Sequence, residues 1–284
     1  MTNKIGIRIA SGMVSVAAVA LAASSAMAAN LDEARALIEE ARQLPEFVAP
    51  GEPFDARACM EGKKVYVIPL TSENPFNVEI ANAQREAAAA VGFDITISDN
   101  QFNIDQWVQG VSTAIADGYD VIDIQGGIPP EAMGPQLAEA REAGIKIAAT
   151  HLYDVTQTPS ELIDGNFAMN YTRAGELMAA WAMVQTEGNV NAVIIGSDEI
   201  IPTGPFVEAI QNYLDANCPD CTHRYVNVPV AEWGSQIQPE VQSALVADPD
   251  INYILPIYDS MSAFVITALT LSNREDVRIA SYNG

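Results

Sequence analysis

From residue 64 to the end of the chain, short apolar stretches alternate with amphipathic ones, and this rhythm constrains the fold more than any other feature. The apolar stretches are rich in Val and Ile, which favour strands, and the stretches between them have helical periodicity. We predict strands at 64–70, 94–98, 121–124, 145–150, 192–196, 224–230, 253–257 and 277–282. We predict helices at 77–91, 104–116, 135–143, 172–185, 206–216, 235–246 and 261–271. This order is typical of an α/β fold with parallel sheets covered on both faces.

The rhythm breaks once, after the fourth strand. Residues 151–160 read as a loop, a short segment follows at 163–169, and a long helix begins at Thr172. The break divides the repeat into two α/β units of roughly 110 residues, an ordinary domain size. We therefore predict an N-terminal lobe over 60–168 and a C-terminal lobe over 169–284. Because a parallel unit normally continues into a helix after its strand, we expect the C-terminal part of the second lobe to be missing.

The first 28 residues resemble a secretory signal peptide. Lys4 and Arg8 give a positively charged N-terminal region, residues 14–23 form an apolar region, and Ala26-Met27-Ala28 matches the A-x-A cleavage motif. The mature protein would then begin at Ala29, in the periplasm. The alternative is an apolar N-terminal helix that stays in the fold. No cysteine follows the motif, and no later stretch reaches the roughly 18 apolar residues of a membrane span, so we expect no membrane anchor.

Residues 29–59 form an extension before the first lobe. Residues 31–44 have the pattern of a charged amphipathic helix, and residues 45–54 contain three prolines, which favour an extended tether. We expect this extension to pack on the outside of the protein.

Charge and cysteine content narrow the class of protein. The net charge is −23, which disfavours binding to nucleic acid or anionic lipid. Cys218 and Cys221 are separated by two residues and would form a local disulfide in an oxidising compartment. A zinc site with nearby His223 and a redox-active pair are the alternatives. Cys59 has no assigned partner.

Polar and aromatic side chains follow several of the predicted strands. In open parallel sheets, ligands bind beyond the carboxyl ends of the strands, so these side chains form a candidate ligand site. Amides and carboxylates hydrogen-bond hydroxyl groups, and aromatic faces cover the apolar edges of rings, so the set suits a neutral polyhydroxylated ligand. The candidates are Asn74, Phe76, Asn77, Gln125, His151, Trp233, Tyr258, Asp259 and Asn283.

Several of these residues also have a purely structural interpretation. Asn74 stands before a proline, as helix N-caps often do, and Asp259 could cap the following helix. Phe76 could be a hydrophobic plug at the base of the following helix, Trp233 could be a core residue, and His151 could serve only its loop.

Catalysis is the weaker hypothesis. The chain has two histidines and lacks the G-x-S-x-G motif and the glycine-rich loop that cradles phosphate. No pair of acids stands at the strand ends as a glycosidase would need. We expect no enzyme activity, no cofactor and no metal.

Several motifs resemble the periplasmic binding protein type I family, and most closely its ribose-binding-like solute receptors of ABC importers. The motifs are KVYVIPLTSENPF at 64–76, DGYDVIDI at 117–124, AGIKI at 143–147, NYTRAG at 170–175 and IASYNG at 279–284. The resemblance runs from about residue 62 to the end. It implies two Rossmann-like lobes joined by a hinge, with a sugar in the cleft between them. It also implies that the family's fold continues beyond the last strand of this chain.

The sequence departs from the family at several ligand positions. The Asp-Arg pair that the family has after its fourth strand is replaced by His151-Leu152, and its second aromatic residue by Asn77. Where the family has an acidic residue near the last strand, this sequence has Asn283. Where the family has an arginine in the second lobe, this sequence has Gly204 or one of its neighbours. Because charge-assisted bonds to hydroxyl groups are lost, a less polar or differently decorated ligand would fit better.

The resemblance implies a periplasmic solute-binding protein that closes around its ligand and delivers it to the membrane permease of an ABC importer. A receptor that signals to a chemoreceptor or sensor kinase would share this fold. A binder of a nucleoside, polyol or aromatic metabolite is a further alternative, and a secreted hydrolase would need catalytic residues outside this chain.

Overall fold

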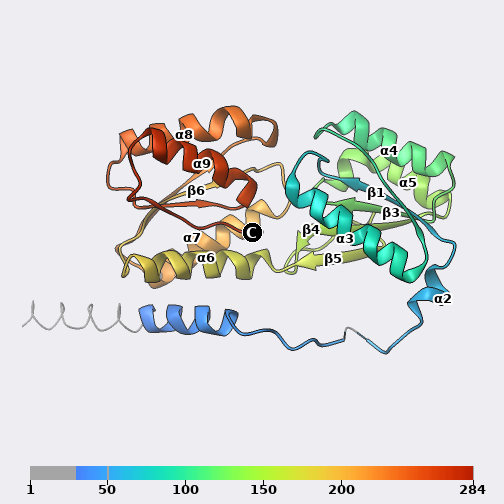
Figure 1. The fold of residues 1–284 in the computed structure, drawn as a ribbon, viewed down its shortest axis with the longest axis horizontal. Coiled ribbons are helices and arrows are strands. Elements are labelled where there is room, and N and C mark those ends of the chain that lie inside the picture. The colour runs from blue at the N-terminus through green and yellow to red at the C-terminus, as the bar shows by residue number, and fades with distance from the viewer. Residues whose placement is uncertain (1–29, 50, 284) are drawn as a thin grey trace, which may run out of the picture.

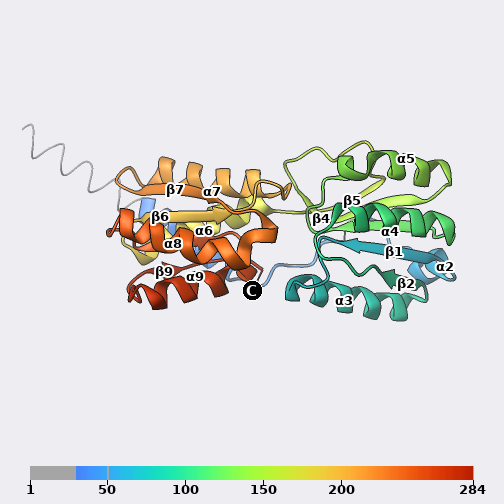
Figure 2. The same cartoon turned by 90° about the horizontal axis from the view of Figure 1, so that it is seen from above.

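The computed structural model describes residues 30–49 and 51–283, which form two lobes side by side (Figure 1). Each lobe is a parallel sheet with helices on both faces, as Figure 2 shows from a second direction. The α/β class and the two parallel sheets predicted from the sequence are therefore confirmed. The expected signal peptide at residues 1–28 lies outside the described residues.

The N-lobe contains a five-stranded sheet in the order β2-β1-β3-β4-β5. Its strands are β1 (Lys64–Pro69), β2 (Asp94–Ile97), β3 (Val121–Gln125), β4 (Lys146–Asp154) and β5 (Gly165–Met169). Its helices are α3 (Pro75–Val91), α4 (Ile104–Ala116), α5 (Gly134–Glu142) and the 3₁₀ turn η1 (Pro130–Met133). The central strands β1 and β3 are almost wholly buried, which explains their nearly continuous apolar sequence.

The C-lobe contains a four-stranded sheet in the order β7-β6-β8-β9. Its strands are β6 (Asn191–Gly196), β7 (Thr222–Asn227), β8 (Tyr253–Pro256) and β9 (Arg278–Ile279). Its helices are α6 (Tyr171–Gln185), α7 (Thr203–Asn217), α8 (Trp233–Ala247), α9 (Asp259–Leu271) and the 3₁₀ turn η2 (Val230–Glu232). Helices α6 and α7 pack closely because Gly175 lies against the backbone of Phe206, where a Cβ would come within 2.6 Å of the carbonyl oxygen.

The strand boundaries differ from the prediction around the passage between the lobes. Strand β4 continues to Asp154, through residues predicted as a loop. The short segment at 163–169, to which no secondary structure was assigned, contains the edge strand β5, which pairs with β4 and carries Phe167 with 64% of its surface exposed. Hydrophobic patterning misses such a strand because an edge strand buries little of its surface. Strand β9 contains only two residues, whereas six were predicted.

The chain passes from the N-lobe to the C-lobe between β5 and α6. Asp154, at the end of β4, has no exposed surface and accepts hydrogen bonds from the backbone N–H groups of Thr156 and Thr172, each at 2.8 Å. The hydroxyl groups of both threonines donate to the same carboxylate. Burial raises the pKa of Asp154, but these four hydrogen bonds together lower it below its usual value. This carboxylate therefore ties the last strands of the N-lobe to the first turn of α6.

The extension touches both lobes. A helix over residues 30–41 lies beside α6 of the C-lobe, and α2 (Ala56–Met60) lies at the far end of the N-lobe (Figure 1). The sequence predicted the helix and the proline-rich tether, whereas the short helix α2 has no clear hydrophobic pattern of its own.

Cys218 and Cys221 form a disulfide at the end of α7, and Cys59 is a free, exposed cysteine. Within residues 30–49 and 51–283, no helix is long and apolar enough to cross a membrane.

Candidate functional site

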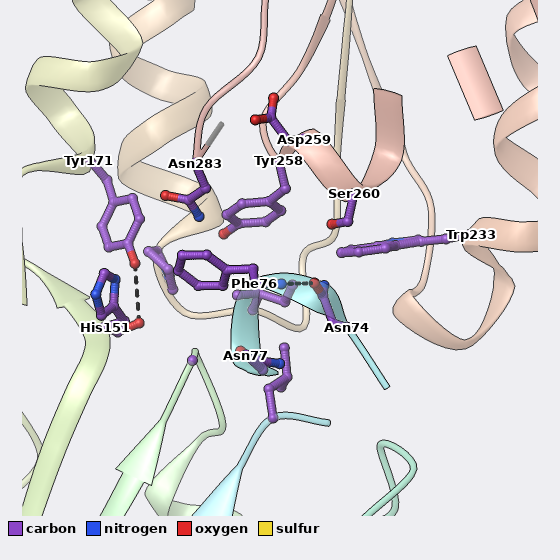
Figure 3. Close-up of a pocket in the computed structure, with 14 residues that line it drawn as sticks. Asn74, Phe76, Asn77, His151, Tyr171, Trp233, Tyr258, Asp259, Ser260 and Asn283 are labelled. Atoms are coloured by element: carbon purple, nitrogen blue, oxygen red, sulfur yellow. Dashed lines mark hydrogen bonds between the residues drawn. The ribbon is translucent and has the colours of Figure 1, made fainter. Parts of the chain in front are cut away.

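A cavity of about 50 Å³ lies between the two lobes, beyond the carboxyl ends of the strands. Eight of the nine residues predicted from the strand ends line it, and Figure 3 shows how they converge. They are Asn74, Phe76, Asn77 and His151 from the N-lobe, and Trp233, Tyr258, Asp259 and Asn283 from the C-lobe. A wider groove of about 450 Å³ adjoins the cavity and shares Leu70, Asn74, Trp233 and Ser260 with it.

The lobes are in direct contact beside the cavity. Gly127 of the N-lobe approaches Ile200 of the C-lobe so closely that a Cβ on Gly127 would lie 2.5 Å from the Ile200 Cγ2 atom. The Gln157 side chain donates to the backbone carbonyl of Ile201 at 3.4 Å. Gly127 also has a φ of +103°, a conformation that only glycine adopts readily. Both the close approach to Ile200 and this backbone conformation therefore require glycine here.

The N-lobe side of the cavity is built by the first turn of α3. Asn74 caps this helix, because its side-chain oxygen accepts from the backbone N–H of Phe76 at 3.0 Å. Asn77 is 3% exposed and donates to the carbonyl of Thr71 at 2.8 Å. Asn74 thus has the helix-capping role that its sequence context suggested. The side chains of Asn74 and Asn77 each spend one hydrogen bond on the backbone of their own segment.

Phe76 and His151 form the more open part of this wall. Both are half-buried, and their rings meet edge to face with centroids 5.5 Å apart. His151 has a φ of +56°, and its ring nitrogen Nδ1 is buried without a hydrogen-bond partner among the described residues. Burial lowers the pKa of His151 below its ordinary value of 6.5, so the neutral ring is favoured.

The C-lobe side is an aromatic stack. The rings of Trp233 and Tyr258 lie nearly parallel with centroids 6.3 Å apart, and each residue is 9% exposed. The Trp233 indole N–H donates to the Ser197 hydroxyl at 2.8 Å and to the Val228 carbonyl at 3.1 Å. Trp233 therefore has most of its ring in the core and only an edge at the cavity.

Two buried tyrosines at the cavity differ in their hydrogen bonding. The Tyr171 hydroxyl donates to the backbone carbonyl of His151 at 3.2 Å, across the two lobes (Figure 3). Among the described residues, the Tyr258 hydroxyl has the Thr203 hydroxyl as its polar neighbour, but their contact falls short of full hydrogen-bond geometry and neither group has another partner. Burial raises the pKa of both tyrosines, so both remain protonated donors. Tyr258 thus brings to the cavity wall a hydroxyl that is less firmly bonded than that of Tyr171.

Asp259 and Asn283 lie at the C-terminal edge of the cavity. The Asp259 carboxylate accepts a hydrogen bond from the Ser281 hydroxyl, and its backbone N–H donates to the Tyr282 carbonyl at 2.9 Å. Asp259 does not cap α9 through its side chain, since it is the first residue of that helix. It is the one carboxylate among the lining residues, and none of these residues is Lys or Arg.

Gln125 does not line the cavity. It is still within β3, where it pairs with Thr150, and it is fully buried. Alternation along the strand places it on the same face as Asp123, which accepts from Gln84 of α3 at 2.8 Å. The glycine that follows, Gly126, lines the cavity instead.

Several lining residues were missed by the strand-end argument. Ile200 and Pro202 follow β6, a strand end that yielded no candidate from the sequence, and Ser260 follows Asp259 in the first turn of α9. Tyr171 begins the helix after β5, the strand that hydrophobic patterning did not reveal. Reading the residues after every strand would have found all of these except Tyr171.

The chemistry of the site suits binding. Aromatic rings, amides and hydroxyl groups face the cavity, and the described residues contain no group of three or more His, Cys, Asp or Glu that could hold a metal ion. Two lobes that meet at a cavity lined by aromatic and amide side chains define the class of two-lobed solute-binding proteins.

Comparison with known proteins defines the family. The family model for the periplasmic binding protein domain matches residues 65–282, which is most of the chain, so the protein belongs to this family of substrate-binding proteins. Members of the family bind ligands and are not enzymes. A search of curated proteins gives no match.

Solved structures show the same fold. An ABC sugar transporter subunit from Rhodobacter sphaeroides superposes with a TM-score of 0.68 at 19% identity, covering 79% of each chain. An ABC transporter solute-binding protein from Agrobacterium vitis with bound allitol gives a TM-score of 0.70 at 18% identity, covering 79% of this chain and 77% of that one. A solute-binding protein of an ABC transporter from Mycobacterium smegmatis with bound glycerol gives a TM-score of 0.64 at 23% identity, covering 76% of this chain and 73% of that one.

Proposed function

We propose that this protein is the periplasmic solute-binding component of an ABC importer and that it binds a neutral, sugar-like small molecule in the cavity between its lobes. The observation that carries the proposal is the lining of the cavity: aromatic rings from both lobes, amides and hydroxyls, one carboxylate and neither Lys nor Arg. Amides and hydroxyls recognise the hydroxyl groups of a polyol, and aromatic faces cover its apolar surface.

The electrostatics of the cavity disfavour an anionic ligand. A phosphate or carboxylate would lie next to Asp259 without an Arg or Lys among the lining residues to balance it. The apolar share of the wall favours a sugar with an apolar substituent over one with a hydroxyl group on every carbon. Proteins of the same fold were solved with 5-methylthioribose and with L-rhamnose, each of which carries an apolar group, and with allitol, which has a hydroxyl group on every carbon; all three ligands are neutral, which supports a neutral, sugar-like ligand.

A thermal-shift screen of the mature protein tests the ligand class. We expect neutral sugars, deoxysugars or polyols to raise the melting temperature, because a ligand that binds only the folded state stabilises it. Sugar phosphates and sugar acids of matched size serve as the control and should have no effect. A melting temperature raised only by anionic compounds, nucleosides or aromatic metabolites would contradict the proposal.

Export and delivery are tested separately. The protein in a periplasmic extract should begin at Ala29, and an N-terminus at Met1 would contradict export. Cross-linking in intact cells should then capture the permease of an ABC importer. Capture of a chemoreceptor or sensor kinase alone would assign the protein to signalling.

A further inference from the structure

The extension lies outside the region that the family model matches, which begins at residue 65. The ligand site does not use it either, since the residues that line the cavity begin at Leu70. Yet the extension contacts both lobes at its two ends, and these contacts indicate what it does.

Its first anchor lies on the C-lobe. In the helix over residues 30–41, Ala34 has no exposed surface and Ile38 is 8% exposed, so both are part of the hydrophobic core. Two polar contacts fix the ends of this helix against the lobe. The Asn30 side chain donates to the Asn217 carbonyl at 2.9 Å, and Glu40 forms an ion pair with Arg173 of α6 at 3.3 Å. Just after the helix, the Arg42 guanidinium lies 5.7 Å from the centre of the Trp181 ring.

Its second anchor lies on the N-lobe. The Arg57 side chain in α2 donates to the carbonyl of Ala90, near the end of α3, at 2.5 Å. The Lys63 ammonium group pairs with Asp120 at 2.7 Å, and the chain then enters β1 in the middle of the sheet. This end of the extension moves with the N-lobe because it is continuous with its sheet.

The segment between the anchors has few contacts of its own. Residues 42–49 and 51–55 are exposed, with 96% of the surface of Leu44 and 86% of that of Phe47 open to solvent. In Figure 1 the tether runs below the passage from β5 to α6, from one lobe to the other. A segment of residues 42–55 spans at most about 50 Å even when fully extended, so its length limits how far apart its two ends can move. The prolines in it reduce its flexibility further.

We propose that the extension is a second connection between the lobes, continuous with the chain of the N-lobe and held on the C-lobe by packing, and that it restrains their relative motion. The passage from β5 to α6 allows the lobes to rotate about it, and a chain anchored on both lobes excludes the rotations that would need a longer tether. The restraint is a property of the protein without ligand, so it holds whatever the cavity binds.

Distances between spin labels on the two lobes test the proposal in the ligand-free mature protein. Labels on Glu86→Cys of α3 and Glu240→Cys of α8 occupy exposed positions on opposite lobes, in a Cys59→Ser background. One variant inserts ten Gly and Ser residues after Phe47, which lengthens the tether and leaves both anchors intact. A second, Ala34→Asp, places a charge at the buried face of the helix, and Ala36→Asp is its control because Ala36 is exposed in the same helix.

We expect the inserted tether and Ala34→Asp each to broaden the distribution of inter-lobe distances, and Ala36→Asp to reproduce the wild-type distribution. If Ala34→Asp broadens the distribution and the insertion does not, the helix is only part of the C-lobe core and the proposal is wrong. If neither variant changes the distribution, the proposal is wrong as well. Since the insertion leaves both packed ends unchanged, it tests the restraint even if Ala34→Asp fails to fold.

Discussion

The two lobes contribute to the cavity in different ways. The N-lobe wall presents Phe76 and His151, which are half-buried and make one aromatic contact with each other. The C-lobe wall presents Trp233 and Tyr258, which are 9% exposed and stacked, with the indole held by two hydrogen bonds. The comparison shows that lining a cavity does not by itself distinguish a ligand contact from a core residue. We expect the C-lobe wall to contribute mainly to stability and the N-lobe wall mainly to affinity.

The largest effect should come from Trp233→Ala. Because the ring is almost fully buried and its N–H is bonded, its loss should lower the free energy of unfolding by about 3–5 kcal/mol. Chemical denaturation of the ligand-free protein measures this. A loss below about 1 kcal/mol would show that the ring is not part of the core and would remove the distinction between the two walls.

Phe76→Ala is the matching change in the N-lobe. If the ring covers an apolar face of the ligand, its loss should reduce the binding free energy by about 1–3 kcal/mol. The stability of the ligand-free protein should fall by only about 1 kcal/mol, because the ring is partly exposed to water and lies outside the core. Calorimetric titration with a sugar from the thermal-shift screen gives the first value, and denaturation gives the second. An unchanged affinity would exclude Phe76 from the site.

Tyr258→Phe and Tyr171→Phe form a matched pair of buried tyrosines. Removing the Tyr258 hydroxyl, whose contact with Thr203 falls short of a full hydrogen bond, should cost less stability than loss of the Tyr171 hydrogen bond, which should cost about 0.5–1.5 kcal/mol. If the Tyr258 hydroxyl donates to the ligand, Tyr258→Phe should also weaken binding by about 0.5–1.5 kcal/mol. Equal stability losses in the two variants would show that the contact between Tyr258 and Thr203 is a full hydrogen bond.

The smallest effect concerns pH and His151. Its pKa is lowered in the folded protein, so the unfolded chain takes up the proton first as the pH falls below 6.5. The wild type should therefore lose stability as the pH falls from 6.5 towards the lower pKa of the folded state. His151→Asn lacks this contribution, and asparagine tolerates the positive φ at this position. Denaturation at several pH values should give a flatter profile for the variant, and parallel profiles would contradict the lowered pKa.

Much of the fold can be predicted from the sequence because parallel strands buried on both faces leave a strong apolar pattern. The exceptions have a common physical cause, which is low burial. Strand β5 is an exposed edge strand, and β9 is reduced to Arg278 and Ile279 at the other sheet's edge. Strand β5 lacks the continuous apolar sequence by which central strands such as β1 are recognised, whereas β9 was predicted over 277–282 but pairs over only two residues.

The site was predictable to the extent that strand ends could be located. Gln125 was misplaced because β3 is one residue longer than predicted, which leaves Gln125 in the sheet and Gly126 at the cavity. The division between ligand contact and core could not be predicted for Trp233. This division depends on the two hydrogen bonds that hold the indole, to Ser197 and Val228. Ser197 is 36 residues away in the sequence and Val228 lies outside the helix of Trp233, so the sequence pattern shows neither bond.

Hydrogen exchange with and without a neutral sugar from the thermal-shift screen tests the central claim, that a ligand binds between the two lobes. The account predicts slower exchange in both walls at once, at residues 71–77 of the N-lobe and at residues 257–261 of the C-lobe. Slower exchange in one lobe only, or in a region that does not line the cavity, would contradict it.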